Sequence, residues 1–230
     1  MLVRHSANDR FHSDFGWLDS HHSFSFGEHY DPNRQGFRNL RVINDDRIAG
    51  GGGFPTHGHR DMEILTWVLE GGVAHRDNIG GSGVIRPGEL QHMTAGRGIA
   101  HSEFNASKDE ALRLLQIWIE PSARGLPPEY SQIAFPAEGR ANRLQLLAAR
   151  GTGQEGVLPL AADASLQVAE LTDGTVHHDI APGRHAWVQV ATGSVTVNGE
   201  TGEEGDGFAL SEEAAVEISG TGQVLVFDLG

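Results

Sequence analysis

The chain has 230 residues, no cysteine, and a formal net charge of −14 from 31 acidic and 17 basic side chains. Without cysteine it forms neither disulfides nor thiolate metal sites, and its dispersed basic residues disfavour nucleic-acid binding, which needs clustered Lys and Arg. The first residues lack the apolar core of a signal peptide, and no run approaches the roughly 18 apolar residues of a membrane span. We therefore expect a soluble cytoplasmic protein that neither enters a membrane nor binds nucleic acid.

Residues 1–49 are predicted to form strands and turns, as the 31 glycines and the scarcity of long helical patterns indicate for the whole chain. His22 shares one face of an alternating stretch with Phe24 and Phe26, because successive strand residues point to opposite faces. His22 is therefore a candidate pocket residue, although a hydrogen-bonded core histidine would show the same pattern. A strand is predicted over residues 37–43, followed by an Asn-Asp-Asp turn at residues 44–46.

The stretch from residue 51 to residue 70 carries the first histidine pair. His57 and His59 are two apart on a predicted strand, so they face the same way. The glycines at 50–53 allow the backbone to approach a cavity closely. Glu63 follows His57 at even spacing, and the apolar run at 64–69 is predicted to be a strand that ends in a Glu-Gly-Gly turn.

A second pair, His101 and Glu103, follows a glycine-rich turn and repeats the same spacing. Two strands therefore offer His57, His59, His101 and Glu103 to one cavity. Three imidazoles and one carboxylate suit iron, copper, nickel, manganese or zinc better than calcium or magnesium. The sequence thus predicts a transition-metal site in the first half of the chain.

The second half repeats the strand pattern without this chemistry. After a proline-containing connector at residues 121–136, short strands separated by turn residues begin near residue 144, and Trp187 starts a run that echoes the one at Trp67. His177 and His178 are adjacent, so they would face opposite sides of a strand, and His185 stands alone. We expect the second half to be metal-free packing support.

These motifs resemble a known family. The pattern G-x5-H-x-H-x3-E that runs from Gly51 to Glu63, with Gly71 after it, resembles the first cupin motif, and Pro87-Gly88 with the histidines that follow resembles the second. The phrases GWLDSHHSFSFGEHYDP, LRVINDD, THGHRDMEILTWVLEG, PGELQHMTAGRGIAHSE and LLQIWIEP are similar to the pirin family, nearest to its short bacterial members, described as quercetin 2,3-dioxygenase-like bicupins. The resemblance extends over nearly the whole chain.

The resemblance implies an all-β bicupin fold. Two tandem antiparallel β-barrel or jelly-roll domains with few short helices are expected. The N-terminal barrel, residues 1–130, would carry the metal site, and the C-terminal barrel, residues 131–230, would be degenerate and metal-free.

The cupin and pirin patterns place the ligands differently. A generic cupin histidine lies five residues after the proline, at His92, and the acidic ligand would be Glu63. The pirin pattern uses His101 and Glu103 instead and leaves Glu63 beside the site, where its carboxylate could orient a ligand imidazole. We favour His101 and Glu103 because this pair repeats the geometry of the first histidine pair, and we expect His92 to be a wall or core residue.

The family resemblance also implies an activity. It indicates a metal-dependent dioxygenase that cleaves a flavonol such as quercetin with O2, with Fe(II) as the first choice of metal and Cu, Ni, Mn, Co or Zn as alternatives. Glu103 or Glu63 would accept the substrate proton, and Phe54, Trp67 and Met93 would receive its flat aromatic rings. Pirins are also described as metal-dependent, redox-responsive regulatory proteins that bind protein partners, so the alternative is a non-catalytic binding module. Fold alone does not decide between these functions.

Overall fold

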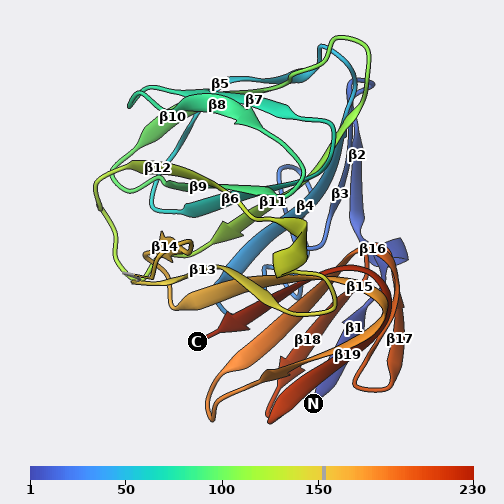
Figure 1. The fold of residues 1–230 in the computed structure, drawn as a ribbon. Coiled ribbons are helices and arrows are strands. Elements are labelled where there is room, and N and C mark those ends of the chain that lie inside the picture. Colours follow the sequence, from blue (N-terminus) through green and yellow to red (C-terminus); the bar gives the residue numbers. More distant parts are fainter. Residues whose placement is uncertain (152–153) are drawn as a thin grey trace.

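The computed structural model describes residues 1–151 and 154–230, which form two stacked β-domains (Figure 1). The front domain comprises β2 (Phe11–Asp14), β3 (Leu18–His22), β4 (Leu40–Ile48), β5 (Gly53–His59), β6 (Glu63–Glu70), β7 (Val73–Asp77), β8 (Ser82–Ile85), β9 (Glu89–Thr94), β10 (Ile99–Asn105), β11 (Leu112–Ile119) and β12 (Glu129–Ala134). The rear domain comprises β1 (Leu2–His5), β13 (Gln145–Arg150), β14 (Leu158–Leu160), β15 (Ala164–Asp179), β16 (His185–Val197), β17 (Glu200–Glu203), β18 (Gly207–Ser211) and β19 (Ala215–Leu229). The described residues contain only two helical segments, the 3₁₀ turns Ala7–Asp9 and Ala137–Gly139. Neither has the length or apolar character to cross a bilayer.

The front domain is a barrel made of two facing sheets. A seven-stranded sheet in the order β12-β9-β6-β11-β4-β3-β2 faces a four-stranded sheet in the order β5-β10-β7-β8 (Figure 1). Alternation along β6 sends Ile64 and Val68 into two separate apolar clusters inside the barrel, with Thr66 between them, while Leu65 and Trp67 face the rear domain. Polar side chains therefore occupy the middle of the barrel, and apolar side chains flank them.

The rear domain is one strongly curved sheet. Its strands follow the path β1-β18-β16-β19-β15-β13-β14, with β17 beside β16, and all pairs are antiparallel except β13 with β14. Bulges between Leu171 and Gly174 on β15, and between Val190 and Thr192 on β16, interrupt the two pairings with β19, and such bulges bend strands. Where the sheet meets the front domain, one face of β16 and β19 packs against that domain, and the opposite face belongs to the rear domain's own core. The predicted all-β bicupin fold is confirmed.

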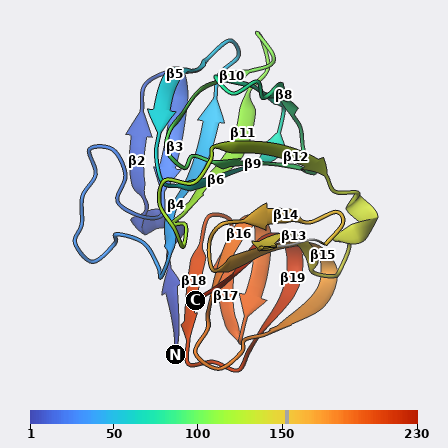
Figure 2. The same cartoon turned by 90° about the vertical axis from the view of Figure 1, so that its left-hand side faces the viewer.

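Strands β1 and β12 show where the chain passes from one domain to the other. The first strand, β1, pairs with β18 and places Leu2 opposite Leu210, so it belongs to the rear sheet; Figure 2 shows both chain termini beside that sheet. Strand β12 pairs along its whole length with β9, with Tyr130 opposite Met93. The expected division between residues 130 and 131 therefore falls inside β12, and the crossover to the rear domain follows Ala134.

The predicted turn at residues 44–46 was wrong. Strand β4 begins at Leu40, later than the predicted strand, and continues through Asn44, Asp45 and Asp46 to Ile48. All three polar side chains are buried, because Asn44 and Asp46 face the interior of the barrel while Asp45 faces the rear domain. Three consecutive polar residues are typical of a turn. Here they lie in the middle of a strand, because one face of β4 lines a cavity and the other face lies at the domain interface.

An ion pair links the domains behind β4. Arg113 on β11 donates hydrogen bonds of 2.9 and 2.8 Å to Asp45 and one of 3.2 Å to the carbonyl of Ala191 in the rear domain. Burial alone would raise the pKa of Asp45, but Arg113 and Arg10 hold it below its ordinary value. The side chain of Arg113 is only 4% exposed, so its charge depends on these partners.

Replacing Arg113 with Ala should lower the free energy of unfolding by about 3 kcal/mol, because the variant leaves the buried carboxylate of Asp45 with only the longer ion pair to Arg10 at 3.3 Å. Arg41→Ala serves as the control, since Arg41 pairs with Glu120 at a half-exposed site, where a pair contributes about 1 kcal/mol or less. Urea unfolding of the two variants measures the difference. Equal losses would show that Arg113 has no special structural role.

Candidate metal centre

Three histidines from two neighbouring strands meet at one point inside the front barrel. His57 and His59 lie on β5, and His101 lies on β10 directly opposite His57. The Nε2 atom of His101 lies 3.1 Å from Nε2 of His57 and 3.0 Å from Nε2 of His59. The predicted spacing of two residues thus brings the three rings together.

The hydrogen bonds on the far side of these rings determine which nitrogen carries the proton. Nδ1 of His57 lies 2.9 Å from the carbonyl of Pro55, to which it donates, so its Nε2 keeps a lone pair. Behind His101, the Nε2–H of His75 donates to Asp77 at 3.1 Å, and Nδ1 of His75 lies 3.4 Å from Nδ1 of His101. Nδ1 of His75 accepts an N–H of Gln91 at 3.1 Å and shares its lone pair, at the longer distance, with the Nδ1–H of His101. Nε2 of His101 therefore also keeps its lone pair.

His59 and His101 are neutral at physiological pH. Burial, followed by the charges of neighbouring histidines, lowers the pKa of His101 to about 2, and the same causes lower that of His59 to about 4. Nitrogens with free lone pairs repel each other at 3.0–3.1 Å unless a cation lies between them. Two donors on adjacent corners of an octahedron, each about 2.1 Å from a metal, are about 3.0 Å apart. This donor set therefore fits a transition-metal ion.

Glu103 stands beside the three histidines. Its carboxylate lies 4.0 Å from Nε2 of His101 and accepts a hydrogen bond from Gln116 at 3.3 Å. The hydroxyl of Thr66 lies 3.5 Å from the same carboxylate and donates its proton to the side-chain oxygen of Gln116 at 2.7 Å. Burial, and then the nearby charge of Asp46, raises the pKa of Glu103 to about 7. The carboxylate is thus held next to the histidines and exchanges its proton near neutral pH.

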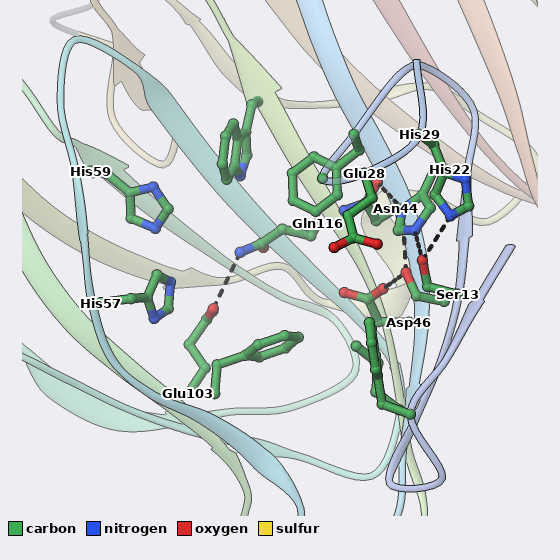
Figure 3. A pocket seen from close by; sticks show the side chains of 17 residues that line it. Ser13, His22, Glu28, His29, Asn44, Asp46, His57, His59, Glu103 and Gln116 are labelled. Carbon is green, nitrogen blue, oxygen red and sulfur yellow. Dashed lines mark hydrogen bonds between the residues drawn. The ribbon is translucent and has the colours of Figure 1, made fainter. Parts of the chain in front are cut away.

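A cavity of about 390 Å³ opens in front of this cluster. Figure 3 shows His57, His59 and Glu103 at one end of it. Its walls come mainly from β2, β3, β4, β5 and β11 and from the loop at residues 26–29. The candidate pocket residues His22 and Phe54 line this cavity, together with Trp118 and Phe26.

Trp67 and Met93, the other two candidate pocket residues, do not line the cavity. Trp67 faces the rear domain, where its indole N–H donates to Gln223 at 2.7 Å. Met93 is fully buried in the apolar cluster that contains Ile64 and Ile99. Both expectations failed because the register of β6 and β9, rather than residue type, decides which side chains face the cavity.

Glu63 also lies outside the cluster. It faces the domain interface, where His92 lies 2.8 Å from its carboxylate and the backbone N–H of Ala161 donates to it at 3.0 Å. Glu63 thus does position an imidazole, but that imidazole belongs to His92, which is buried and does not point at the other histidines. The generic cupin pattern would therefore select two residues on the wrong face of the sheet.

Other histidines form no comparable site. Within residues 1–151 and 154–230, no group of potential metal ligands includes a rear-domain residue; His178 pairs with Asp228 and His185 with Ser211, and His177 is exposed. The front domain has two further groups: His12, Asp19 and His21 on the outer face of the β2–β3 hairpin, and the buried His75, His101 and Glu103, which overlaps the histidine cluster through His101.

Several residues of the site escaped prediction. His75 and Asp77 lie two apart on β7, a spacing that places them on one face, and this is the signal that could have identified them. Gln116 shows no such signal, because its role depends on β11 lying beside β6. Asp46 was hidden by its resemblance to a turn residue.

Asp46 is fully buried on the cavity wall. Ser20 donates a short hydrogen bond to one of its oxygens. Burial, and then the neighbouring charge of Asp45, raises the pKa of Asp46 to about 7, although the bond from Ser20 opposes the shift. The folded protein therefore carries this carboxyl at a cost in stability whenever it is ionised.

Comparison with known proteins agrees with this geometry. Residues 4–119 match the Pirin family and residues 146–229 match the quercetinase C-terminal cupin domain. The chain belongs to the pirin family, and its fold is the pirin-type bicupin. It is 46% identical over 233 residues to a quercetin 2,3-dioxygenase of Escherichia coli K12, covering all of this chain and 99% of that protein. It is 40% identical over 220 residues to a putative quercetin 2,3-dioxygenase of Pseudomonas aeruginosa, covering 95% and 94% of the two chains.

A solved structure shows the same likeness. The bacterial pirin YhhW from Escherichia coli, in complex with nickel(II), superposes with a TM-score of 0.93 at 46% identity and covers 100% of this chain and 99% of its own. A protein with this fold and nearly half of its residues in common thus binds nickel(II).

The raised pKa of Asp46 predicts a pH-dependent stability. In the native state the carboxyl of Asp46 keeps its proton up to about pH 7, whereas in the unfolded state it loses the proton near its ordinary pKa of 3.8. The free energy of unfolding of the wild type therefore falls as the pH rises from about 4 to about 7. Asp46→Asn should remove this loss, so the unfolding free energy of the variant minus that of wild type should grow by roughly 2–4 kcal/mol from pH 4 to pH 8.

Urea unfolding of chelator-treated protein across this pH range tests the prediction. Asp109→Asn is the control, since Asp109 is exposed and water solvates its charge in both states. A difference that does not change with pH for Asp46→Asn would show that the carboxylate is stabilised in a way the structure does not reveal.

Proposed function

We propose that this protein is a metal-dependent dioxygenase that cleaves a flavonol such as quercetin with O2, and that His57, His59, His101 and Glu103 hold the metal. The observation that carries the proposal is the convergence of three imidazoles, in which the Nε2 atoms of His59 and His57 lie 3.0 and 3.1 Å from that of His101, at the end of a cavity with aromatic walls. The relatives named quercetin 2,3-dioxygenase support the reaction class.

We propose Fe(II) as the first candidate for the metal. Nitrogen and oxygen donors also accept Cu, Ni, Mn, Co or Zn, and the nickel(II) complex of the related pirin supports an ion of this group. A bound ion of this kind would supply Lewis acidity toward the adjacent hydroxyl and carbonyl oxygens of a flavonol, and a route for electrons from the flavonol to O2.

The side chains around the cluster supply the remaining functions. Phe54 and Trp118 line the cavity beside the histidines and offer apolar faces to flat aromatic rings. Glu103, whose carboxylate lies beside the histidines, would accept the proton of the flavonol 3-hydroxyl. Gln116 and Thr66 hold its carboxylate in place, and Glu63, which faces the other domain, has no part in this step.

A direct test measures turnover by metal-loaded protein. Oxygen consumption with quercetin, loss of the flavonol absorbance and release of carbon monoxide together support the dioxygenase. Inertness with iron, nickel, copper, manganese, cobalt and zinc would overturn it and favour the alternative in the pirin family, a metal-responsive regulatory protein that acts through a protein partner.

The ligand assignment predicts opposite outcomes for two histidines. His101→Ala should abolish both metal binding and turnover, because it removes the nitrogen that lies closest to both other imidazoles. His92→Ala should retain the metal, since His92 faces Glu63 at the domain interface. Metal analysis of both purified variants decides the assignment, and retention of metal by His101→Ala with loss in His92→Ala would refute it.

The hydrogen-bond chain behind His101 predicts a smaller effect. His75→Ala removes the acceptor that fixes the tautomer of His101, so metal affinity should fall by about 10–100-fold while metal is still bound at saturation. Tyr130→Phe is the matched control, because it keeps the ring that stacks on His75 at 4.7 Å. Competition titration with a chelator measures both affinities, and equal values for the two variants would argue against a role for His75.

A further inference from the structure

The cavity has a second polar end, away from the histidine cluster. Figure 3 shows Ser13, His22, His29, Asn44 and Asp46 gathered on one side, with His57, His59 and Glu103 on the other and Gln116 between them. This far wall, which we define as Ser13, Ser20, His22, His29, Asn44 and Asp46, comes from β2, β3, β4 and the loop after β3. The proposed reaction uses none of these residues.

The hydrogen bonds within the far wall have a fixed direction. Nδ1 of His22 lies 2.8 Å from the side-chain oxygen of Asn44 and donates to it, so its Nε2 accepts the hydroxyl proton of Ser13 at 3.0 Å. The oxygen of Ser13 then accepts from Nε2 of His29, also at 3.0 Å. Burial lowers the pKa of His22, which agrees with a neutral ring in this chain.

This network leaves specific groups free to bind a ligand. Among residues 1–151 and 154–230, the amide nitrogen of Asn44 and the second carboxyl oxygen of Asp46 have no hydrogen-bond partner, although both side chains line the cavity. One group is a donor and the other an acceptor, two positions apart on the same face of β4. A hydroxyl group, which both donates and accepts, complements this pair.

The composition of the cavity wall narrows the ligand class further. None of the described residues that line the cavity is lysine or arginine, and the carboxylates of Asp46, Glu28 and Glu103 all border it. Such a wall disfavours carboxylate or phosphate ligands, which need cationic partners. Aromatic side chains, Phe26 and Trp118 among them, lie along the same cavity and favour a flat ring.

A purely structural role does not account for these residues. Asn and Asp are depleted in strands, and a buried carboxyl with a single hydrogen bond from Ser20 destabilises the fold. An apolar residue at position 46 would pack on β4 at no such cost. The position is therefore better explained by a ligand than by stability.

We propose that the far wall is a subsite for the ring hydroxyl groups of a polyhydroxylated flavonol, with Asp46 accepting a hydrogen bond from a phenol and Asn44 donating one to it. The inference rests on the proposed function for the placement of the flavonol's 3-hydroxyl and carbonyl oxygens at the histidine cluster. It adds that the enzyme selects its substrate by hydroxyl groups at the opposite end.

Quercetin and 3-hydroxyflavone provide the test. Both carry the chelating hydroxyl and carbonyl pair, but only quercetin has further ring hydroxyls. Nickel-loaded protein titrated calorimetrically without O2 should bind quercetin at least about 10-fold more tightly than 3-hydroxyflavone, as expected for a hydrogen bond to a charged group. Asp46→Asn should reduce this ratio to about 3-fold or less, and Asn44→Asp, which keeps the acceptor for His22, should reduce it as well.

Asp109→Asn is the matched control, because Asp109 is exposed and lies outside both the cavity and every group of potential metal ligands among the described residues; it should retain the wild-type ratio. A ratio that is unchanged in both cavity variants, or a wild-type ratio near one, would overturn the subsite. Failure to bind either flavonol would overturn both the subsite and the dioxygenase.

The two proposals fail separately in the remaining cases. Discrimination between the flavonols without oxygen consumption would support the subsite and refute the dioxygenase. Turnover of both flavonols with equal affinity would support the dioxygenase and refute the subsite.

Discussion

The arrangement of the front barrel depends on keeping three imidazole nitrogens close together, with Nε2 of His101 3.1 Å from that of His57 and 3.0 Å from that of His59. Such nitrogens repel each other in the absence of a cation, so the surrounding structure must hold them in place. The carbonyl of Pro55 fixes the ring of His57, and the Asp77–His75 pair fixes that of His101. Strand pairing between β5 and β10 supplies the rest, because it places His57 directly opposite His101.

The same barrel assigns different tasks to the two faces of each strand. On β4, Asp46 faces the cavity while the adjacent Asp45 binds Arg113 at the domain interface. On β6, Thr66 supports Glu103 while Glu63 binds His92 and the rear domain. Neighbouring residues of like chemistry thus serve the site and the interface, and only their position in the pleat distinguishes them.

This alternation also explains how far the sequence could be interpreted. The all-β bicupin fold followed from the resemblance to the pirin family, whereas the grouping of His57, His59 and His101 followed from a spacing of two residues, which is a local property of a strand. Trp67, Met93 and Glu63 were misplaced because the direction in which they point depends on register with distant strands. Asp46 was missed for a different reason: in sequence, a buried polar triplet cannot be distinguished from a turn.

The pairing of β1 with β18 imposes an order on assembly. The first four paired residues have partners about 200 positions later, at Gly207–Leu210, so during synthesis at 5–20 residues per second they remain unpaired for roughly 10–40 s. The front barrel has all its own strands by Ala134 and can close in that interval, whereas the rear sheet cannot be completed until β18 and β19 have been synthesised. The front barrel, which carries His57, His59 and His101, can therefore close before β1 pairs with β18 in the rear sheet.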